Sequence, residues 1–149
     1  MDNRIGVKEY INNKDLLSIK KYIPYAEKVN IVDAIMKQVC TNINGMYSVN
    51  SLLLDRIKTQ IFIEQLTNLN LSMIDEETKL DGYDLLVFSD NLDLLVNDII
   101  EKEFLELNRL LDLRIDDYLR DKASAKGFFN YKFERMLDYI DLKVPMLID

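Results

Sequence analysis

The chain has 149 residues, of which 48% are hydrophobic and 30% are charged, and its formal net charge is −7. A chain of this length fits one domain that buries about two thirds of its unfolded surface, and its apolar content excludes a disordered acidic tail. Four glycines and two prolines are too few for a sandwich or barrel rich in tight turns. We therefore expect an all-α fold, an irregular single-domain bundle of about five to seven helices over residues 1–149.

Apolar residues three and four positions apart predict the individual helices. In chain order, helices are expected at residues 3–11, 16–23, 26–40, 51–69, 83–88, 91–122 and 128–142. Within this set, a break is expected near Ile100 and a joint at residues 123–127. Residues 1–14 are also candidates for an arm that is flexible or becomes ordered only on assembly.

Polar and turn-forming residues mark the helix starts and the connections. Asp15 is a good N-cap for the second helix, and Asn50 or Ser51 for the fourth. Residues 41–48, with two asparagines and a glycine, are expected to form a loop, and residues 68–77 a polar connection.

The negative charge is concentrated in one segment of the chain. Residues 75–117 contain fourteen carboxylates and four cations, which leaves −10, whereas residues 1–50 contain seven cations and five anions, which leaves +2. A negative field repels nucleic acid and favours basic protein surfaces. We therefore expect basic protein surfaces as partners and no direct contact with nucleic acid.

The sequence lacks the residues of the common catalytic and metal sites. It contains no histidine and a single cysteine, Cys40, which excludes Ser-His-Asp and Cys-His arrangements and a cysteine-rich zinc site within the chain. No glycine pair forms a phosphate-binding pattern. Cys40 is the last residue of a predicted amphipathic helix. A cysteine at such a position is more often a small buried hydrophobic residue than a nucleophile. We expect neither enzymatic activity nor a cofactor.

Carboxylates alone are left as candidate metal ligands. Asp112 and Asp116 lie four residues apart, so a helix places them on one face, where they could hold Mg²⁺ or Mn²⁺ against a phosphate. The spacing of Glu106 to Arg109 and of Asp116 to Arg120 instead favours ordinary surface ion pairs. Sign-mixed charge of this kind is typical of a solvated helix face, and we expect no metal site.

The chain has no segment that predicts secretion or membrane insertion. Its first residues lack the apolar run of a signal peptide, and no stretch approaches the roughly 18 uncharged apolar residues of a membrane span. A lone cysteine cannot form an intramolecular disulfide, so folding does not require an oxidising compartment. We expect an intracellular protein, or one assembled inside a cell, without a membrane partner.

Two stretches are candidates for an interaction surface. The first is a basic, tyrosine-containing cluster around Pro24, which could grip a nucleic-acid backbone or form a corner whose tyrosine rings pack inward; the net charge favours the corner. The second is the acidic face of the predicted helix 91–122. Together the candidate residues are Lys20, Lys21, Tyr22, Tyr25, Glu101, Glu106, Asp112, Asp116 and Asp117.

Three short stretches resemble a group of phage proteins. They are Lys20-Lys21-Tyr22-Ile23-Pro24-Tyr25-Ala26-Glu27-Lys28, Asn44-Gly45-Met46-Tyr47-Ser48-Val49 and Asp81-Gly82-Tyr83-Asp84-Leu85-Leu86. Together they are similar to small acidic helical proteins encoded among the virion-morphogenesis genes of tailed phages that infect Gram-positive bacteria. The similarity spans residues 7–115 and rests on short motifs. It implies a structural or assembly protein of the head, neck or tail, and it carries over no catalytic residue.

The leading functional hypothesis is a non-enzymatic virion protein at the head–tail neck. Its partners would be other virion proteins or copies of itself, and it would occupy the host cytoplasm during assembly and then the virion. The basic N-terminal third and the acidic middle segment would supply the two different patches that a ring requires. The alternative is an acidic inhibitor that imitates nucleic acid and blocks a host nuclease or other defence protein.

Overall fold

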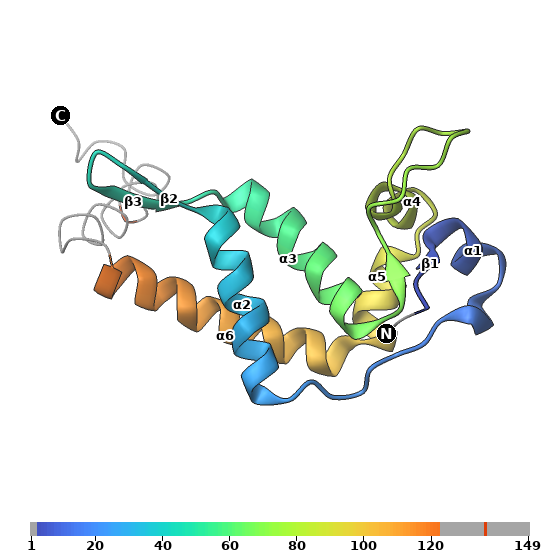
Figure 1. Cartoon of the computed structure of the whole chain (residues 1–149), viewed down its shortest axis with the longest axis horizontal. Coiled ribbons are helices and arrows are strands. Elements are labelled where there is room, and N and C mark those ends of the chain that lie inside the picture. The colour runs from blue at the N-terminus through green and yellow to red at the C-terminus, as the bar shows by residue number, and fades with distance from the viewer. Residues whose placement is uncertain (1–2, 123–135, 137–149) are drawn as a thin grey trace.

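The computed structural model describes residues 3–122 and residue 136. Over these residues the protein is mostly helical, with six α-helices and a few short strands (Figure 1). The expected helical character is confirmed, but a purely all-α class is wrong, because four strands form two small sheets. The molecule is elongated, and these two sheets lie toward opposite ends of it (Figure 1).

Three long helices form the central core. They are α2 (Tyr25–Val39), α3 (Ser51–Leu66) and α6 (Glu101–Asp117), and each packs against the other two. The predicted helices 26–40 and 51–69 are confirmed with small shifts at their ends. Asn50 caps α3 as expected, because its side chain accepts a hydrogen bond from the Leu53 backbone at 3.1 Å. The rings of Phe62 and Phe104 meet edge to face, with centroids 5.3 Å apart, and join α3 to α6.

A second packing unit covers one end of α3. It consists of β1 (Ile5–Gly6), α1 (Val7–Asn12), β4 (Leu69–Asn70) and α4 (Gly82–Phe88). Strands β1 and β4 pair in parallel, and α1 packs on α4. Val7 and Tyr10 are almost completely buried there. Residues 5–12 therefore belong to the packed core rather than to the arm that we considered for residues 1–14.

The helix predicted at residues 16–23 is wrong. Only a 3₁₀ turn, η1 (Lys14–Leu16), forms, and an extended chain follows it up to α2. The backbone of this stretch instead pairs with the end of α3: Lys20 N–H donates to the Leu66 carbonyl at 2.8 Å, and Ile19 forms a β-bridge with Thr67. Pro24 also disfavours helical backbone in the residue before it.

The loop predicted at residues 41–48 is a β-hairpin. Strand β2 (Cys40–Ile43) pairs with β3 (Met46–Val49) in antiparallel register, and Asn44 and Gly45 form the two-residue turn. Their φ angles of 54° and 79° are those of a type I′ turn, which an Asn-Gly pair favours.

The last helical region alternates between α-helical and π-helical geometry. It contains α5 (Leu92–Leu94), the π-turn η2 (Leu95–Ile99), α6 and the π-turn η3 (Tyr118–Lys122). The expected break near Ile100 is confirmed, because this residue has a φ of −115° and donates to the Leu95 carbonyl five residues back. The predicted joint at 123–127 and helix at 128–142 lie outside the described residues, residue 136 aside.

None of the helices within the described part of the chain has both the length and the apolar character needed to cross a membrane.

Gly82 fills a position with no room for a side chain. A Cβ at this position would lie 2.7 Å from the Leu71 Cα and 2.9 Å from a Val7 methyl group. We expect Gly82→Ala to lower the free energy of unfolding by about 1–3 kcal/mol through this overlap, as measured by urea denaturation. Gly6→Ala is the matched control: its Cβ would meet side-chain atoms of Met73 and Glu9 at ordinary contact distances of 3.7 and 3.8 Å, and its stability should equal or exceed that of the wild type. Equal losses in both variants would contradict the close approach at Gly82.

Candidate interaction surfaces

The basic and aromatic residues before α2 lie at the surface. Lys20, Lys21 and Tyr22 belong to the extended chain, and Tyr25 is the first residue of α2. The tyrosine side chains are 62% and 63% exposed. The corner interpretation, with both rings packed inward, is therefore wrong for these two tyrosines.

A buried ion pair lies behind these tyrosines. Lys28 Nζ and Glu103 Oε2 are 3.0 Å apart, and the two side chains are only 5% and 8% exposed. The same carboxylate oxygen accepts a hydrogen bond from the Ile23 backbone at 3.3 Å, and the ammonium group lies 4.7 Å from the centre of the Tyr22 ring. The start of α2 is thus fixed against the start of α6 by a contact that sequence spacing does not reveal.

A groove runs between α2 and α6 beside this pair. We call it the α2–α6 groove; its volume is about 170 Å³, and it is lined by Tyr25, Val29, Val32, Leu110, Leu113, Arg114 and Asp117. Arg114 donates to Asp33 at 2.9 Å, and this hydrogen bond raises the pKa of the guanidinium group. The groove therefore has an apolar centre, with Leu113 half exposed, and a charged rim.

The structure divides the acidic candidates among different faces of α6. Asp117 joins Tyr25 in the α2–α6 groove. Asp112, five residues before Asp117, lies about 140° away around the helix axis. Glu101, Asp112 and Asp116 are exposed outside this groove. The nine candidate residues therefore do not form one continuous surface.

The predicted ion pair between Glu106 and Arg109 is present on α6. Its oxygen and nitrogen are 2.7 Å apart, and the hydrogen bond lowers the pKa of the Glu106 carboxyl. No ion pair joins Asp116 to Arg120 in the described structure, since the chain enters the wider π-turn η3 between them.

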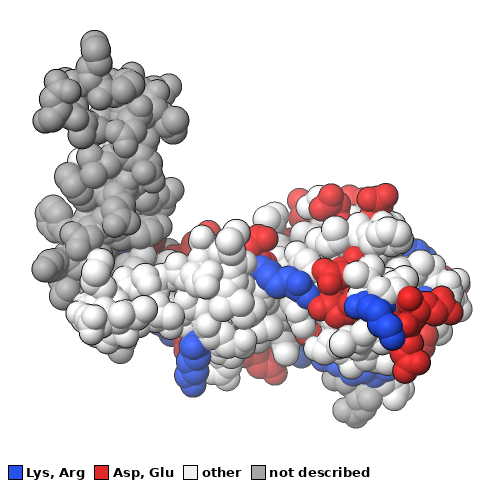
Figure 2. All heavy atoms as spheres, turned by 90° about the horizontal axis from the view of Figure 1, so that it is seen from above, with Lys and Arg blue, Asp and Glu red and all other residues white. Residues whose placement is uncertain are grey.

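Part of the acidic segment is paired with cations within the molecule. Six of its fourteen carboxylates pair with cations; these are Asp75 and Glu77 with Lys8, Asp81 and Asp84 with Arg56, Glu103 with Lys28, and Glu106 with Arg109. Figure 2 shows cations and carboxylates beside one another over the end that carries α1 and α4. Lys8 and Lys28 come from the basic N-terminal third, so part of the expected charge contrast between segments is cancelled by folding.

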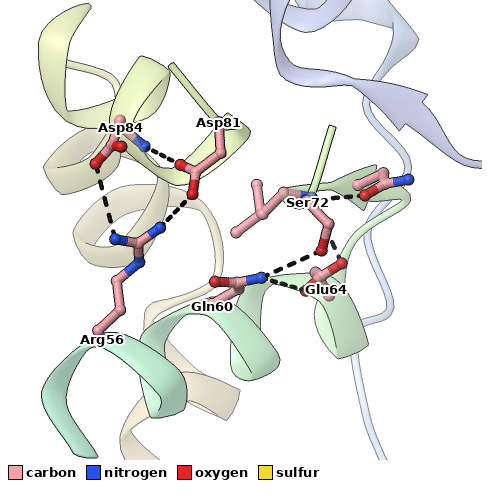
Figure 3. Close-up of polar contacts among 8 residues, drawn as sticks. Arg56, Gln60, Glu64, Ser72, Asp81 and Asp84 are labelled. Atoms are coloured by element: carbon pink, nitrogen blue, oxygen red, sulfur yellow. Dashed lines mark hydrogen bonds and ion pairs between the residues drawn. The ribbon is translucent and has the colours of Figure 1, made fainter. Parts of the chain in front are cut away.

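Arg56 is the centre of one such contact (Figure 3). From α3 it reaches Asp81 at 2.5 Å and Asp84 at 3.8 Å, and its guanidinium carbon lies 4.2 Å from the centre of the Tyr83 ring. Asp81 also caps α4, because it accepts a hydrogen bond from the Asp84 backbone at 2.9 Å. Residues 81–84, which belong to the stretch 81–86 that carries the phage resemblance, thus anchor α4 to α3.

A neighbouring network holds the chain after β4 (Figure 3). Gln60 donates to Glu64 at 3.3 Å and to the Ser72 hydroxyl at 3.5 Å. Glu64 in turn accepts from the Leu71 backbone at 3.4 Å. These contacts from α3 fix the beginning of the loop that leads to α4.

The described residues offer no assembled metal site. In residues 3–120, no three carboxylate or thiol side chains gather closely enough to hold a metal ion. Asp112 and Asp116 therefore have no third ligand of this kind beside them within that part of the chain.

Comparison of the chain with protein-family models, with curated proteins and with solved structures found no match.

Breaking the buried ion pair is expected to be costly. In Glu103→Gln, the Lys28 ammonium would remain buried without its counter-charge, and we expect a loss of about 3–5 kcal/mol in the free energy of unfolding. Glu106→Gln removes the solvent-accessible partner of Arg109 and should cost far less, because solvent screens a surface ion pair. Urea denaturation of both variants measures the difference. Equal, small losses would contradict a structural role for the buried pair.

Cys40 is expected to be a poor nucleophile. Burial raises the pKa of its thiol from 9.0 to about 11, which at neutral pH lowers the thiolate fraction about 100-fold. We therefore expect iodoacetamide to alkylate native Cys40 about 100-fold more slowly than the same cysteine in urea-unfolded protein. Mass spectrometry over a time course measures both rates, and equal rates would show that the thiol is not shielded.

Proposed function

We propose that the chain is a non-enzymatic phage virion protein that acts at the head–tail neck through contacts with other proteins. Its partners would be other virion proteins or further copies of the chain, first in the host cytoplasm and then in the virion. The phage setting is supported by the resemblance of the three short stretches. The mode of action is supported by the surface described above.

The observation that carries a contact function is the exposed aromatic and apolar area at the α2–α6 groove. Tyr25 and Leu113 line the groove and are each more than half exposed. Tyr22, which is also more than half exposed, lies outside this lining and close to the Lys28 ammonium group. Charged groups surround the groove, including the Arg114–Asp33 pair and Asp117. An apolar and aromatic centre inside a charged rim is the usual composition of a protein–protein contact.

The apolar surface is not limited to this groove. At the end with the β-hairpin, Ile43 is 67% exposed and Leu52 is 85% exposed. Exposed apolar side chains in separate places suit a protein with more than one neighbour, as an assembly subunit has.

The alternative of a nucleic-acid mimic has weaker support. A mimic needs carboxylates that present an uninterrupted row of negative charge to a basic groove. Lys8, Arg56, Lys28 and Arg109 each neutralise carboxylates of the acidic segment. The pairing leaves a mixed surface, which suits contact with a protein better than imitation of phosphates.

The proposal is tested by affinity capture with the full chain from phage-infected cells. We expect portal, tail or capsid components to co-purify, and the variant Tyr25→Arg/Leu113→Arg to retain less than about one tenth of them, because two charges would enter the apolar centre of the groove. The control Phe88→Arg/Leu105→Arg adds the same charge at exposed apolar positions outside the α2–α6 groove and should retain most of them.

Two results would contradict the proposal. One is a monomeric protein that never co-purifies with a virion component. The other is capture of a host nuclease or polymerase subunit in place of virion components, which would favour the inhibitor.

A further inference from the structure

A second and larger groove lies at the opposite end from the hairpin. It is formed by α1 and the loop that precedes α4, and its volume is about 510 Å³. We call it the α1 groove. Its lining consists of Gly6, Val7, Lys8, Glu9, Asn12, Met73, Ile74, Asp75, Glu76, Glu77 and Leu85. It shares none of these residues with the α2–α6 groove.

One part of the α1 groove is apolar and open to solvent. Met73 is 52% exposed and Ile74 is 66% exposed, and both come from the loop. Val7 and Leu85 continue this area toward the core. An apolar side chain from a partner would bury surface chiefly against Met73 and Ile74, and this burial of apolar area favours binding.

The rest of the lining is acidic. Glu9, Asp75, Glu76 and Glu77 contribute four negative charges and Lys8 one positive charge, so the lining carries −3. Lys8 lies 3.2 Å from Asp75 and 3.4 Å from Glu77, whereas it forms no ion pair with Glu9 or Glu76 within the described residues. The latter two carboxylates are exposed on either side of the groove, one on α1 and one on the loop.

The loop is held in shape by its own hydrogen bonds. Asp75 accepts from the Thr78 hydroxyl at 2.7 Å and from the Thr78 backbone at 3.1 Å, and these bonds lower the pKa of its carboxyl. The Asp75 backbone donates to the Leu80 carbonyl at 2.8 Å and accepts from Lys79 at 2.7 Å. A wall fixed in this way loses little conformational freedom when a partner binds.

We infer that the α1 groove binds a segment of another protein that carries an apolar side chain flanked by lysine or arginine. The apolar side chain would contact Met73 and Ile74, and the flanking cations would lie near Glu9 and Glu76. The basic character follows from the −3 lining and from the chain's net charge of −7, which disfavours a second copy as the occupant. The α1 groove would bind such a segment whether or not the chain is a virion protein.

The test uses the full-length protein and two labelled peptides. One alternates leucine and lysine, and the other has glycine in place of each leucine, so that both carry the same charge. Fluorescence anisotropy is expected to give a Kd about tenfold lower for the leucine peptide. Ile74→Ser, at an exposed position, should remove most of this preference and leave the affinity for the glycine peptide unchanged.

A charge-matched pair of variants locates the site. Glu9→Lys/Glu76→Lys should weaken binding of the leucine peptide about tenfold, while Asp112→Lys/Asp116→Lys, with the same change in net charge on α6, should weaken it less than about twofold. Circular dichroism verifies that each variant is folded. Should Glu9→Lys/Glu76→Lys fail to fold, the Ile74→Ser result alone supports or overturns the inference.

Three outcomes would overturn it. Equal affinity for the two peptides would mean that only charge is recognised. Equal weakening by the two charge variants would mean that binding is not at this groove. Self-association of the wild type that Glu9→Lys/Glu76→Lys abolishes, measured by analytical ultracentrifugation, would make a second copy the occupant.

Discussion

The buried contact between Lys28 and Glu103 is the constraint on which the main surface depends. It joins the first turn of α2 to the first turn of α6. The Lys28 Nζ and Glu103 Oε2 atoms are 3.0 Å apart, and both side chains are almost completely buried. Charges so shielded are stable only as a pair, because either alone would lack both water and a counter-charge. The two helices therefore have little freedom to slide along each other at this end.

The geometry of the α2–α6 groove follows from this constraint. Ile23 N–H donates to the same carboxylate, which fixes the chain just before Pro24. Tyr25 consequently lies in the groove beside α6, Tyr22 lies against the Lys28 ammonium group, and neither ring is buried. The ion pair is thus structural, and the tyrosines that it positions are the residues available to a partner.

Local patterns predicted the central helices but not the contacts between them. Helix α2 was predictable because Ile31, Val32, Ile35 and Val39 form one apolar face, and all four are buried. The 16–23 region has similar apolar content, yet its backbone bonds to the end of α3, a tertiary contact that overrides periodicity. The Asn44-Gly45 pair is a local signal for the hairpin, because it favours the type I′ turn that joins two antiparallel strands. The polar composition of residues 41–48 predicts only a loop.

The charged surface was the least predictable part. Counting charges along the sequence gives a strongly acidic middle segment, and folding then places Lys8, Lys28 and Arg56 among its carboxylates. These pairs join residues far apart in the sequence, so no spacing rule identifies them. The α1 groove was missed for the same reason, since its two walls come from α1 and from the loop before α4.

The separation of the two grooves has a consequence for how the protein would act. They share no lining residue, so one occupant does not exclude the other by direct overlap. A protein that holds one partner in each groove acts as a bivalent linker, and the first contact raises the effective concentration for contacts between the partners themselves. Two weak contacts can then hold an assembly that neither would hold alone.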